Sequence, residues 1–262
     1  MSQVKFITST ANPLIKEIKS LEMRKRRKET GLFVAEGMRT IVEGIELGAE
    51  LHTLIFSSEV KARADVIKAR DYAAQAVEVN DMVLEKISRK ENPQSVIGIF
   101  KQKLLSLDEV TTDGVWVVLE EVRDPGNLGT IIRTIDSVGA KGVILIGTCC
   151  DPYSFESVRA TMGSIFLVPI ITAVRDDFIA WSKNWSGQIF GTTLQDSIDY
   201  REVEYASPLL LIMGNEQAGM TDELRAICTN LIHLPMKGRA DSLNLAIATG
   251  VMLYMIESRL ER

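Results

Sequence analysis

The second half of this 262-residue chain contains a series of short, continuously apolar stretches, and this series constrains the fold more than any other feature. Segments of helical character separate them. Strands that are apolar along their whole length are typical of a parallel sheet covered by helices on both faces. The pattern predicts an α/β domain whose ligands bind at the carboxyl ends of the strands. The expected strands are Val115–Leu119, Val143–Ile146, Ile165–Val168, Gln188–Thr192, Leu209–Met213 and Leu231–Leu234.

Residues before about 105 follow a different pattern, and a polar stretch over 101–113 separates them from the apolar strands. Asn12 as N-cap and Pro13 in the first turn predict a helix over 12–28. Shorter strands and helices after it predict a compact α/β module. We therefore expect two domains, 1–105 and 106–262. The other expected elements of the first are strands at 32–35, 51–56 and 98–100 and helices at 39–47 and 62–73.

Charge is distributed unevenly between these halves. Residues 1–105 carry 18 Lys and Arg against 14 Asp and Glu, whereas residues 106–262 carry 12 against 21. Residues 16–28 hold seven basic and two acidic side chains. Such a run either binds phosphates or forms a solvated helix face. We define the basic cluster as Lys16, Arg24, Lys25, Arg26 and Arg27.

Composition excludes several protein classes. An apolar content of 46% and ordinary glycine and proline counts exclude disordered and collagen-like chains. No apolar run is long enough to cross a bilayer, and the first ten residues lack a leader pattern, so we expect a cytoplasmic protein. Cys149, Cys150 and Cys228 show neither disulfide nor zinc spacing, so we expect free thiols and no metal.

The first apolar strand runs into a loop from Glu120 to Gly129, and the helix after it carries Arg133. Glycines and a proline predict a tight turn, with Arg133 in about the first turn of the helix. The loop lacks the GxGxxG and phosphate-loop patterns. It is either a plain strand-to-helix turn with a surface arginine or part of a binding site.

A second polar loop, 214–224, follows the strand Leu209–Met213. Thr221 is a candidate cap for the next helix, whose first turn explains Asp222 and Glu223. Glu216 has no such explanation. Its carboxylate either recognises donors on a ligand or is simply solvated.

The third loop precedes a final helix that ends near Leu260. Asp241 or Ser242 is a candidate N-cap. The helix is apolar in nearly every direction, which predicts that it is buried, against a second subunit or inside the domain. His233 lies in an apolar strand and is more typical of a core or edge histidine than of a catalytic one. No GxSxG pattern supports a serine nucleophile.

Together these three loops resemble the SpoU/TrmH family of the SPOUT superfamily, whose members are RNA ribose 2′-O-methyltransferases that use S-adenosylmethionine. The match lies in 122–134, in 213–219, and in 234–236 with 242–244. Residues 9–16, 24–27, 31–33 and 35–37 resemble the ribosomal-protein-like substrate-binding module often fused to these enzymes. The resemblance implies a deep trefoil knot in the parallel-sheet domain.

The resemblance also implies site residues. In the family, the residue at Arg133 is often assigned to activate the ribose hydroxyl. A guanidinium with a pKa above about 12 is better suited to hold the phosphate and the developing alkoxide. The catalytic positions are Asn127, Arg133, Glu216, Ser242 and Asn244, and the donor-binding positions are Gly191, Thr192, Gly214, Glu216, Leu234, Met236, Ser242 and Leu243.

The resemblance therefore implies transfer of a methyl group to structured RNA without a metal, leaving S-adenosylhomocysteine. Large-subunit ribosomal RNA is the favoured substrate because of the N-terminal module. Transfer RNA is the alternative substrate, and a noncatalytic RNA-binding protein is the alternative function. We expect the basic cluster to contact RNA and the last helix to form a homodimer.

Overall fold

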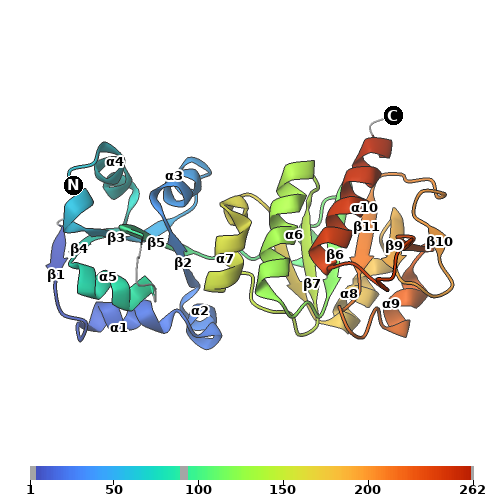
Figure 1. Cartoon of the computed structure of the whole chain (residues 1–262), viewed down its shortest axis with the longest axis horizontal. Helices are drawn as coiled ribbons and strands as arrows, with labels where there is room; N and C mark the ends of the chain where they lie inside the picture. The colour runs from blue at the N-terminus through green and yellow to red at the C-terminus, as the bar shows by residue number, and fades with distance from the viewer. Residues whose placement is uncertain (1–3, 89–93, 261–262) are drawn as a thin grey trace. The chain divides into compact units, whose positions relative to one another are not determined.

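The computed structural model describes residues 4–88 and 94–260, which form two compact units (Figure 1). The first unit contains the described residues up to Gln102 together with 151–166. The second contains 103–150 and the described residues from 167 onward. A segment from the second half of the sequence is therefore part of the first unit. The predicted boundary at residue 105 does not account for this segment.

A mixed five-stranded sheet, ordered β1-β4-β3-β5-β2, forms the centre of the first unit. β1, β4 and β3 are parallel, whereas β5 is antiparallel to both β3 and β2. This mixed sheet confirms the predicted α/β character of the N-terminal module. The strands are β1 (Lys5–Ile7), β2 (Leu32–Glu36), β3 (Leu51–Ser57), β4 (Gln75–Val79) and β5 (Val96–Lys101), and the helices are α1 (Pro13–Ser20), α2 (Arg24–Thr30), α3 (Met38–Glu46), α4 (Ala64–Tyr72), α5 (Asp81–Ser88) and α7 (Phe155–Thr161).

The helix expected over 12–28 is two helices, α1 and α2. Asn12 caps α1 as predicted, because its Oδ1 accepts a hydrogen bond of 2.9 Å from the Leu14 amide. The chain turns at 21–23, which leaves the carbonyl oxygens of Leu21 and Glu22 without helical donors. Arg27 Nη1 donates to both, at 2.7 and 2.8 Å. The break is thus stabilised by a side chain of the helix that follows it.

Aromatic packing holds the segment 151–166 against β2. The ring of Tyr153 lies 4.8 Å from that of Phe33, and the ring of Phe166 lies 4.7 Å from that of Phe100 in an edge-on contact. The predicted strand at 165–168 is wrong: residues 164–166 form a short 3-10 turn, and the strand β8 begins only at Ile170. Phe166 leaves the second unit's sheet because it packs in the first unit's core.

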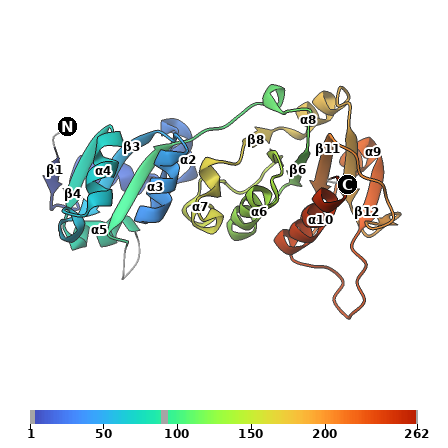
Figure 2. The same ribbon diagram turned by 90° about the horizontal axis from the view of Figure 1, so that it is seen from above.

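The second unit has a seven-stranded sheet in which all pairings are parallel, ordered β10-β12-β9-β11-β6-β7-β8. Helices cover both faces, with α6 and α10 side by side on one and α8 and α9 on the other (Figures 1 and 2). The predicted parallel sheet is confirmed, while the knot stays a prediction. The strands are β6 (Val115–Glu120), β7 (Gly142–Ile146), β8 (Ile170–Ala173), β9 (Gln188–Thr192), β10 (Ile198–Asp199), β11 (Leu209–Met213) and β12 (Asn230–His233), and the helices are α6 (Pro125–Val138), α8 (Arg175–Ser182), α9 (Asp222–Ile227) and α10 (Leu245–Leu260).

The strand order places the three motif loops at one edge of this sheet. β6 pairs with β11, β11 with β9, and β9 with β12. Because all four strands are parallel, the loops that leave their carboxyl ends are neighbours. Of the helices that the structure describes, none is both long and apolar enough to cross a bilayer.

Candidate active site

The sequence Asp124-Pro125-Gly126-Asn127 builds the start of α6. Asp124 is the N-cap, and its Oδ1 accepts a hydrogen bond of 2.6 Å from the Asn127 amide. Pro125 occupies the first helical position, where its missing N–H costs nothing. The carboxylate of Asp124 also complements the positive end of the helix dipole. The motif thereby fixes Asn127 in the first turn of α6, at the sheet edge where the motif loops meet.

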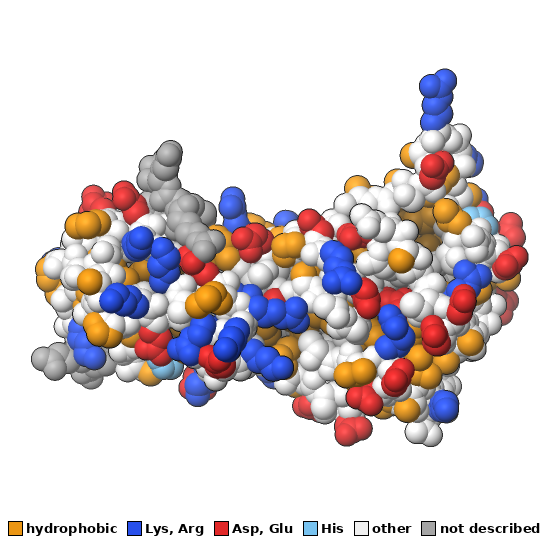
Figure 3. Space-filling model, turned by 90° about the horizontal axis from the view of Figure 1, so that it is seen from below, with side chains coloured by type: hydrophobic (Ala, Val, Ile, Leu, Met, Phe, Trp, Pro, Cys, Tyr) orange, Lys and Arg blue, Asp and Glu red, His pale blue; other side chains and the backbone are white. Residues whose placement is uncertain are grey.

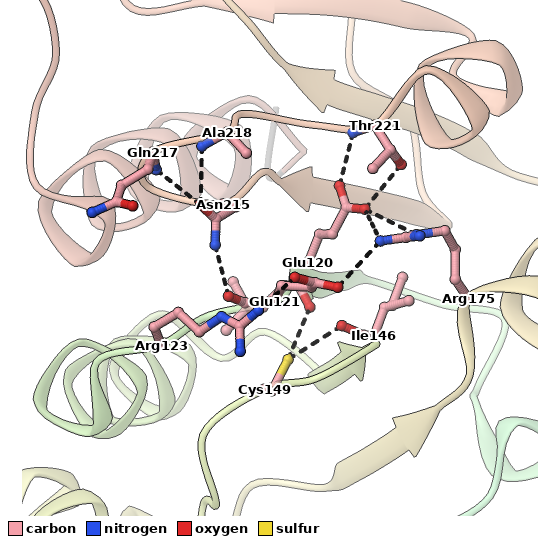
Figure 4. A network of polar contacts seen from close by, with 11 residues as sticks. Glu120, Glu121, Arg123, Ile146, Cys149, Arg175, Asn215, Gln217, Ala218 and Thr221 are labelled. Carbon is pink, nitrogen blue, oxygen red and sulfur yellow. Dashed lines mark hydrogen bonds and ion pairs between the residues drawn. The ribbon is translucent and has the colours of Figure 1, made fainter.

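The loop after β11 is a tight turn that presents Glu216. Asn215 Oδ1 accepts from the amides of Gln217 and Ala218, at 2.9 and 3.0 Å, and its Nδ2 donates to the Glu121 carbonyl at 2.9 Å (Figure 4). A Cβ on Gly214 would lie 2.5 Å from the Met220 nitrogen, so only glycine fits there. The turn itself is thus set by Asn215 and Gly214, and Asn215 also attaches it to the end of β6.

Three predicted catalytic side chains form one chain of hydrogen bonds. Asn127 Nδ2 donates to Glu216 Oε1 at 2.5 Å, and Asn244 Nδ2 donates to Asn127 Oδ1 at 2.9 Å. An ionised carboxylate only accepts hydrogen bonds, so Glu216 fixes the orientation of the Asn127 amide. The fold brings these residues together from three separate loops.

Asn244 also starts α10. Its Oδ1 accepts from the amides of Ala246 and Ile247, at 2.9 and 3.3 Å, and the helix begins at Leu245. The prediction that Asp241 or Ser242 caps this helix is wrong, because the helix starts later. Ser242 lies in the exposed loop just before it, and no contact joins it to the Asn127–Glu216–Asn244 chain.

Arg133 lies in the third turn of α6 rather than the first. It is six residues beyond Asn127, which corresponds to about 9 Å along a helix axis. Its side chain is exposed, and it forms no hydrogen bond or ion pair with any residue in the described parts of the chain. Long helical side chains lean toward the N-terminus, which is the direction of Asn127. Arg133 is thus a cation on the helix that carries Asn127, and its side chain has no partner among residues 4–88 and 94–260.

The predicted donor-binding residues lie at the ends of three adjacent strands. Thr192 ends β9, Gly214 follows β11, and Leu234 follows β12. Met236, Ser242 and Leu243 lie in the loop between β12 and α10, which projects from the second unit (Figure 2).

Gly191 has a packing explanation. A Cβ there would lie 2.5 Å from Met220 Cε and 2.6 Å from Cys228 Sγ. Glycine at this position therefore leaves room for the side chains of Met220 and Cys228, and this packing explains the glycine without a ligand.

The basic cluster of the first unit divides into exposed and committed residues. Lys16 and Arg24 are exposed, and Lys25 is 85% exposed although it lies 3.9 Å from Glu29. Arg26 forms an ion pair of 2.6 Å with Glu29. Arg27 is only 6% exposed, and its guanidinium donates to Asp151 Oδ2 at 2.7 and 2.9 Å. We correct the expectation for Arg27, since its donors are used inside the unit. On the face of the molecule drawn in Figure 3, Lys and Arg side chains gather mainly over the first unit.

The three cysteines are free, as expected. Burial raises the pKa of the Cys149 thiol above its usual range and that of Cys228 to about 12, so both stay protonated near neutral pH. His233 is an edge-region histidine whose Nδ1 lies 3.0 Å from Ser197 Oγ. Within 4–88 and 94–260, no group of three or more His, Cys, Asp or Glu side chains is arranged to hold a metal ion.

Sequence reasoning missed the polar network behind the Gly214–Gly219 loop. Glu120, Glu121 and Arg175 form it together with Asn215 and Thr221 (Figure 4). Thr221 is at the N-cap position of α9, but its hydroxyl donates to Glu120 instead of capping the helix. One signal was available: a glutamate as the last residue of an otherwise apolar strand.

Comparison with known proteins identifies the family. The SpoU rRNA Methylase family matches residues 114–254, and the MRM3-like substrate binding domain matches 12–98. A solved AdoMet-bound rRNA methyltransferase from Sinorhizobium meliloti is 44% identical, with 99% of each chain covered and a TM-score of 0.92. The 23S rRNA (guanosine(2553)-2′-O)-methyltransferase RlmP of Bacillus subtilis is 27% identical over 96% of this chain and 98% of its own.

A tRNA (guanosine(18)-2′-O)-methyltransferase of Escherichia coli is 34% identical, but over only 53% of this chain and 60% of its own. The family match covers more than half of the sequence and includes every residue of the hydrogen-bonded chain from Asn127 to Asn244. The chain belongs to the SpoU rRNA methylase family.

Proposed function

We propose that this protein transfers a methyl group from S-adenosylmethionine to a ribose 2′-hydroxyl of structured RNA. The observation that carries the proposal is the convergence of Asn127, Glu216 and Asn244 in one hydrogen-bonded chain. Arg133 is exposed on α6, the helix that carries Asn127. Family membership supports the reaction class, and the S. meliloti structure is of an AdoMet-bound protein. The noncatalytic alternative does not account for an amide–carboxylate chain assembled from all three motif segments.

The second unit offers groups that fit the methyl donor. At the carboxyl ends of β9, β11 and β12, the main chain and small or apolar side chains (Thr192, Gly214 and Leu234) are adjacent. Such edges bind adenine and methionine moieties through backbone groups and apolar contacts. The cofactor, when bound, supplies a methyl group on a sulfonium centre. No metal is needed, so a chelator should leave activity unchanged.

Arg133 and the Asn127–Glu216–Asn244 chain have separate roles in the proposed reaction, namely charge stabilisation and positioning of the ribose. Arg133 holds a phosphate of the RNA and stabilises the negative charge that develops on the ribose oxygen. A guanidinium has donors and no acceptor, so Arg133 acts as a cation and not as the proton acceptor. Glu216 and Asn244 hold the Asn127 amide in one orientation, which positions the ribose for in-line attack.

Large-subunit ribosomal RNA is the favoured substrate within this proposal. The relative named for 23S rRNA matches nearly the whole chain, and the match to the MRM3-like substrate binding domain covers 12–98. The relative named for tRNA matches only about half of it. A first unit with exposed basic residues suits a large folded RNA. Such a substrate places the enzyme in the cytoplasm.

A homodimer through α10 is also part of the proposal. Ile247, Val251 and Tyr254 are 56%, 41% and 58% exposed. Their spacing of four and three residues puts them on one face, while the opposite face packs in the unit. The alternative of a helix buried wholly inside the domain is excluded by these exposed side chains, and the open apolar face is suited to a second copy. Light scattering of wild type and Val251→Glu tests this, with a dimer expected only for wild type.

One experiment tests the activity and the substrate together. Purified protein is incubated with labelled S-adenosylmethionine and either ribosomal RNA or transfer RNA from a strain that lacks it. We expect label in the ribose of one large-subunit nucleotide, and none with Arg133→Ala. Transfer to tRNA alone would replace the substrate assignment. No transfer to either RNA, with methylation maps identical in mutant and parent, would contradict the proposal.

A further inference from the structure

A buried carboxylate lies behind the candidate site, on the other face of the sheet. Glu120, the last residue of β6, is 1% exposed. Residues alternate between faces along a strand, so Glu120 shares the face of Trp116 and Val118, which α8 and α9 cover. A buried carboxylate is strongly unfavourable unless it is paired and hydrogen bonded. The partners of Glu120 are therefore essential to this part of the fold.

Four donor contacts surround this carboxylate. Thr221 donates its amide to Oε2 and its hydroxyl to Oε1, both at 2.9 Å. Arg175 approaches Oε1 through Nε at 3.1 Å and Nη2 at 3.0 Å (Figure 4). Arg175 Nη2 also lies 3.4 Å from Glu121 Oε1. The donors come from the start of α8 and the start of α9.

Local structure alone does not explain either donor. Arg175 is the first residue of α8, where the helix dipole disfavours a cation. Thr221 is at the N-cap position of α9 but forms no side-chain capping bond. Capping is the ordinary use of a threonine there and stabilises a helix by about 1 kcal/mol. Both side chains are committed to Glu120 instead.

The loop that carries Glu216 is consequently fixed at both ends to consecutive residues. At its start, Asn215 donates to the Glu121 carbonyl at 2.9 Å. At its end, Thr221 is held by the Glu120 side chain. Glu121 itself has a positive φ of 48°, so the backbone turns sharply between the two anchors and the start of α6.

We propose that Glu120 is a positioning residue for methyl transfer, which acts through Thr221 to hold the 214–221 loop so that Glu216 meets Asn127. The inference rests on the proposed function, because it assigns Glu216 and Gly214 to the reaction. The side chain of Glu120 bonds Thr221 and Arg175 and forms no hydrogen bond with Glu216 or Gly214. Its effect on catalysis must therefore appear as a change in the position or mobility of the loop.

Two substitutions at Thr221 test the anchor without disturbing the Glu120–Arg175 pair. Thr221→Val removes only the hydroxyl bond and keeps the side-chain volume, whereas Thr221→Ser retains the hydroxyl. We expect Thr221→Val to lower the single-turnover rate at saturating donor about tenfold, the usual size for one hydrogen bond to a charged group. Thr221→Ser should restore most of it. Thr53→Val, a buried strand threonine of the first unit, is the matched control and should leave the rate unchanged.

Amide hydrogen exchange reads the loop independently of activity. Thr221→Val and Glu120→Gln should speed exchange at Gln217 and Ala218, and Thr221→Ser should not. A lower melting temperature with normal exchange there and a normal rate would overturn the positioning role. Faster exchange in a protein whose wild type transfers no methyl group would refute the proposed function but leave the anchor in place. Glu120→Gln perturbs the buried carboxylate more strongly than Thr221→Val does. If Glu120→Gln does not fold, Thr221→Val still tests the positioning role.

Discussion

Arg27 on α2 and Arg133 on α6 are both helical arginines that lie within sequence motifs, but the fold uses them in opposite ways. Arg27 is nearly buried and donates to Asp151 and to two backbone carbonyls. Arg133 is exposed, and its side chain forms no hydrogen bond or ion pair in the described part of the chain. The first arginine holds a unit together, and the second is left available for a ligand.

The comparison teaches that a run of basic residues does not reveal which of its members are available. Arg27 is one of five consecutive cations, but its partner Asp151 is 124 residues away in sequence. A contact of such separation leaves no periodic signal. Arg133 is the only cation of α6, and its side chain forms no ion pair with any described residue, although Asp136 follows three residues later on the same helix.

The largest effect should come from breaking the pair of Arg27 with Asp151. Arg27→Ala leaves Asp151 unpaired at 14% exposure and two carbonyls without donors. Removal of one partner of a buried ion pair costs about 3–5 kcal/mol. We expect the free energy of unfolding of the first unit to fall by that amount, measured by urea denaturation with hydrogen exchange to assign the unit.

The control for this prediction is Asp151→Asn, which keeps the volume and one acceptor and should cost less. The double variant should cost less than the sum of the two single variants, because the groups interact directly. Stability equal to wild type in Arg27→Ala would make Arg27 an ordinary surface cation. An RNA contact at this position would then regain support.

Much of the second unit's fold could be predicted because its signals are local. Continuous apolar strands specify a parallel sheet, and the order of loops follows from strand ends at a common edge. The strand at 165–168 was mispredicted because its apolar residues satisfy a different core: Phe166 packs on Phe100 of the first unit. An apolar run indicates burial but not the partner that buries it.

The candidate site shows the same limit. Asn127, Glu216 and Asn244 were found from motifs, and the structure shows them in contact. Glu120 was missed because its role depends on Thr221, 101 residues later, and on Arg175. Helix capping is the ordinary role of a threonine at the position of Thr221, so the sequence does not reveal its bond to Glu120.

The next effect in size concerns Arg133. Arg133→Ala should lower turnover about 100- to 1000-fold, the usual cost of one preorganised donor at a developing oxyanion. Donor affinity and the free energy of unfolding should stay unchanged, since the exposed side chain of Arg133 forms no hydrogen bond or ion pair with the described residues. Single-turnover rates and calorimetry with S-adenosylmethionine measure both. This variant is the opposite of Arg27→Ala, with activity lost and stability kept.

Arg133→Lys distinguishes a fixed cation from a proton acceptor. As a cation, lysine keeps the charge but loses the planar fork, so its rate should lie between those of Arg133→Ala and wild type. That order should hold from pH 7 to 9, because an ordinary lysine has a pKa near 10.4 and stays charged. A lysine variant that overtakes wild type as pH rises would instead assign proton transfer to this position.

The smallest effect should come from the exposed members of the basic cluster. Arg24 and Lys25 lie on the surface of α2, where Lys25 is 3.9 Å from Glu29. Arg26 contacts the same Glu29 at 2.6 Å, and Arg27 is bonded to Asp151. Replacing Arg24 and Lys25 by Ala should reduce the slope of log affinity against log salt by about 0.7–0.9 for each RNA phosphate that the variant no longer neutralises. Filter binding to ribosomal RNA from 50 to 200 mM salt measures the slope. The matched control is Lys183→Ala, because this exposed lysine follows α8 near the amino ends of the strands, away from the site.

The free energy of unfolding of each variant should stay within about 0.5 kcal/mol of wild type, as is usual for surface changes. An unchanged slope in the double variant, or an equal change in Lys183→Ala, would show that α2 presents a solvated face rather than a surface that binds RNA.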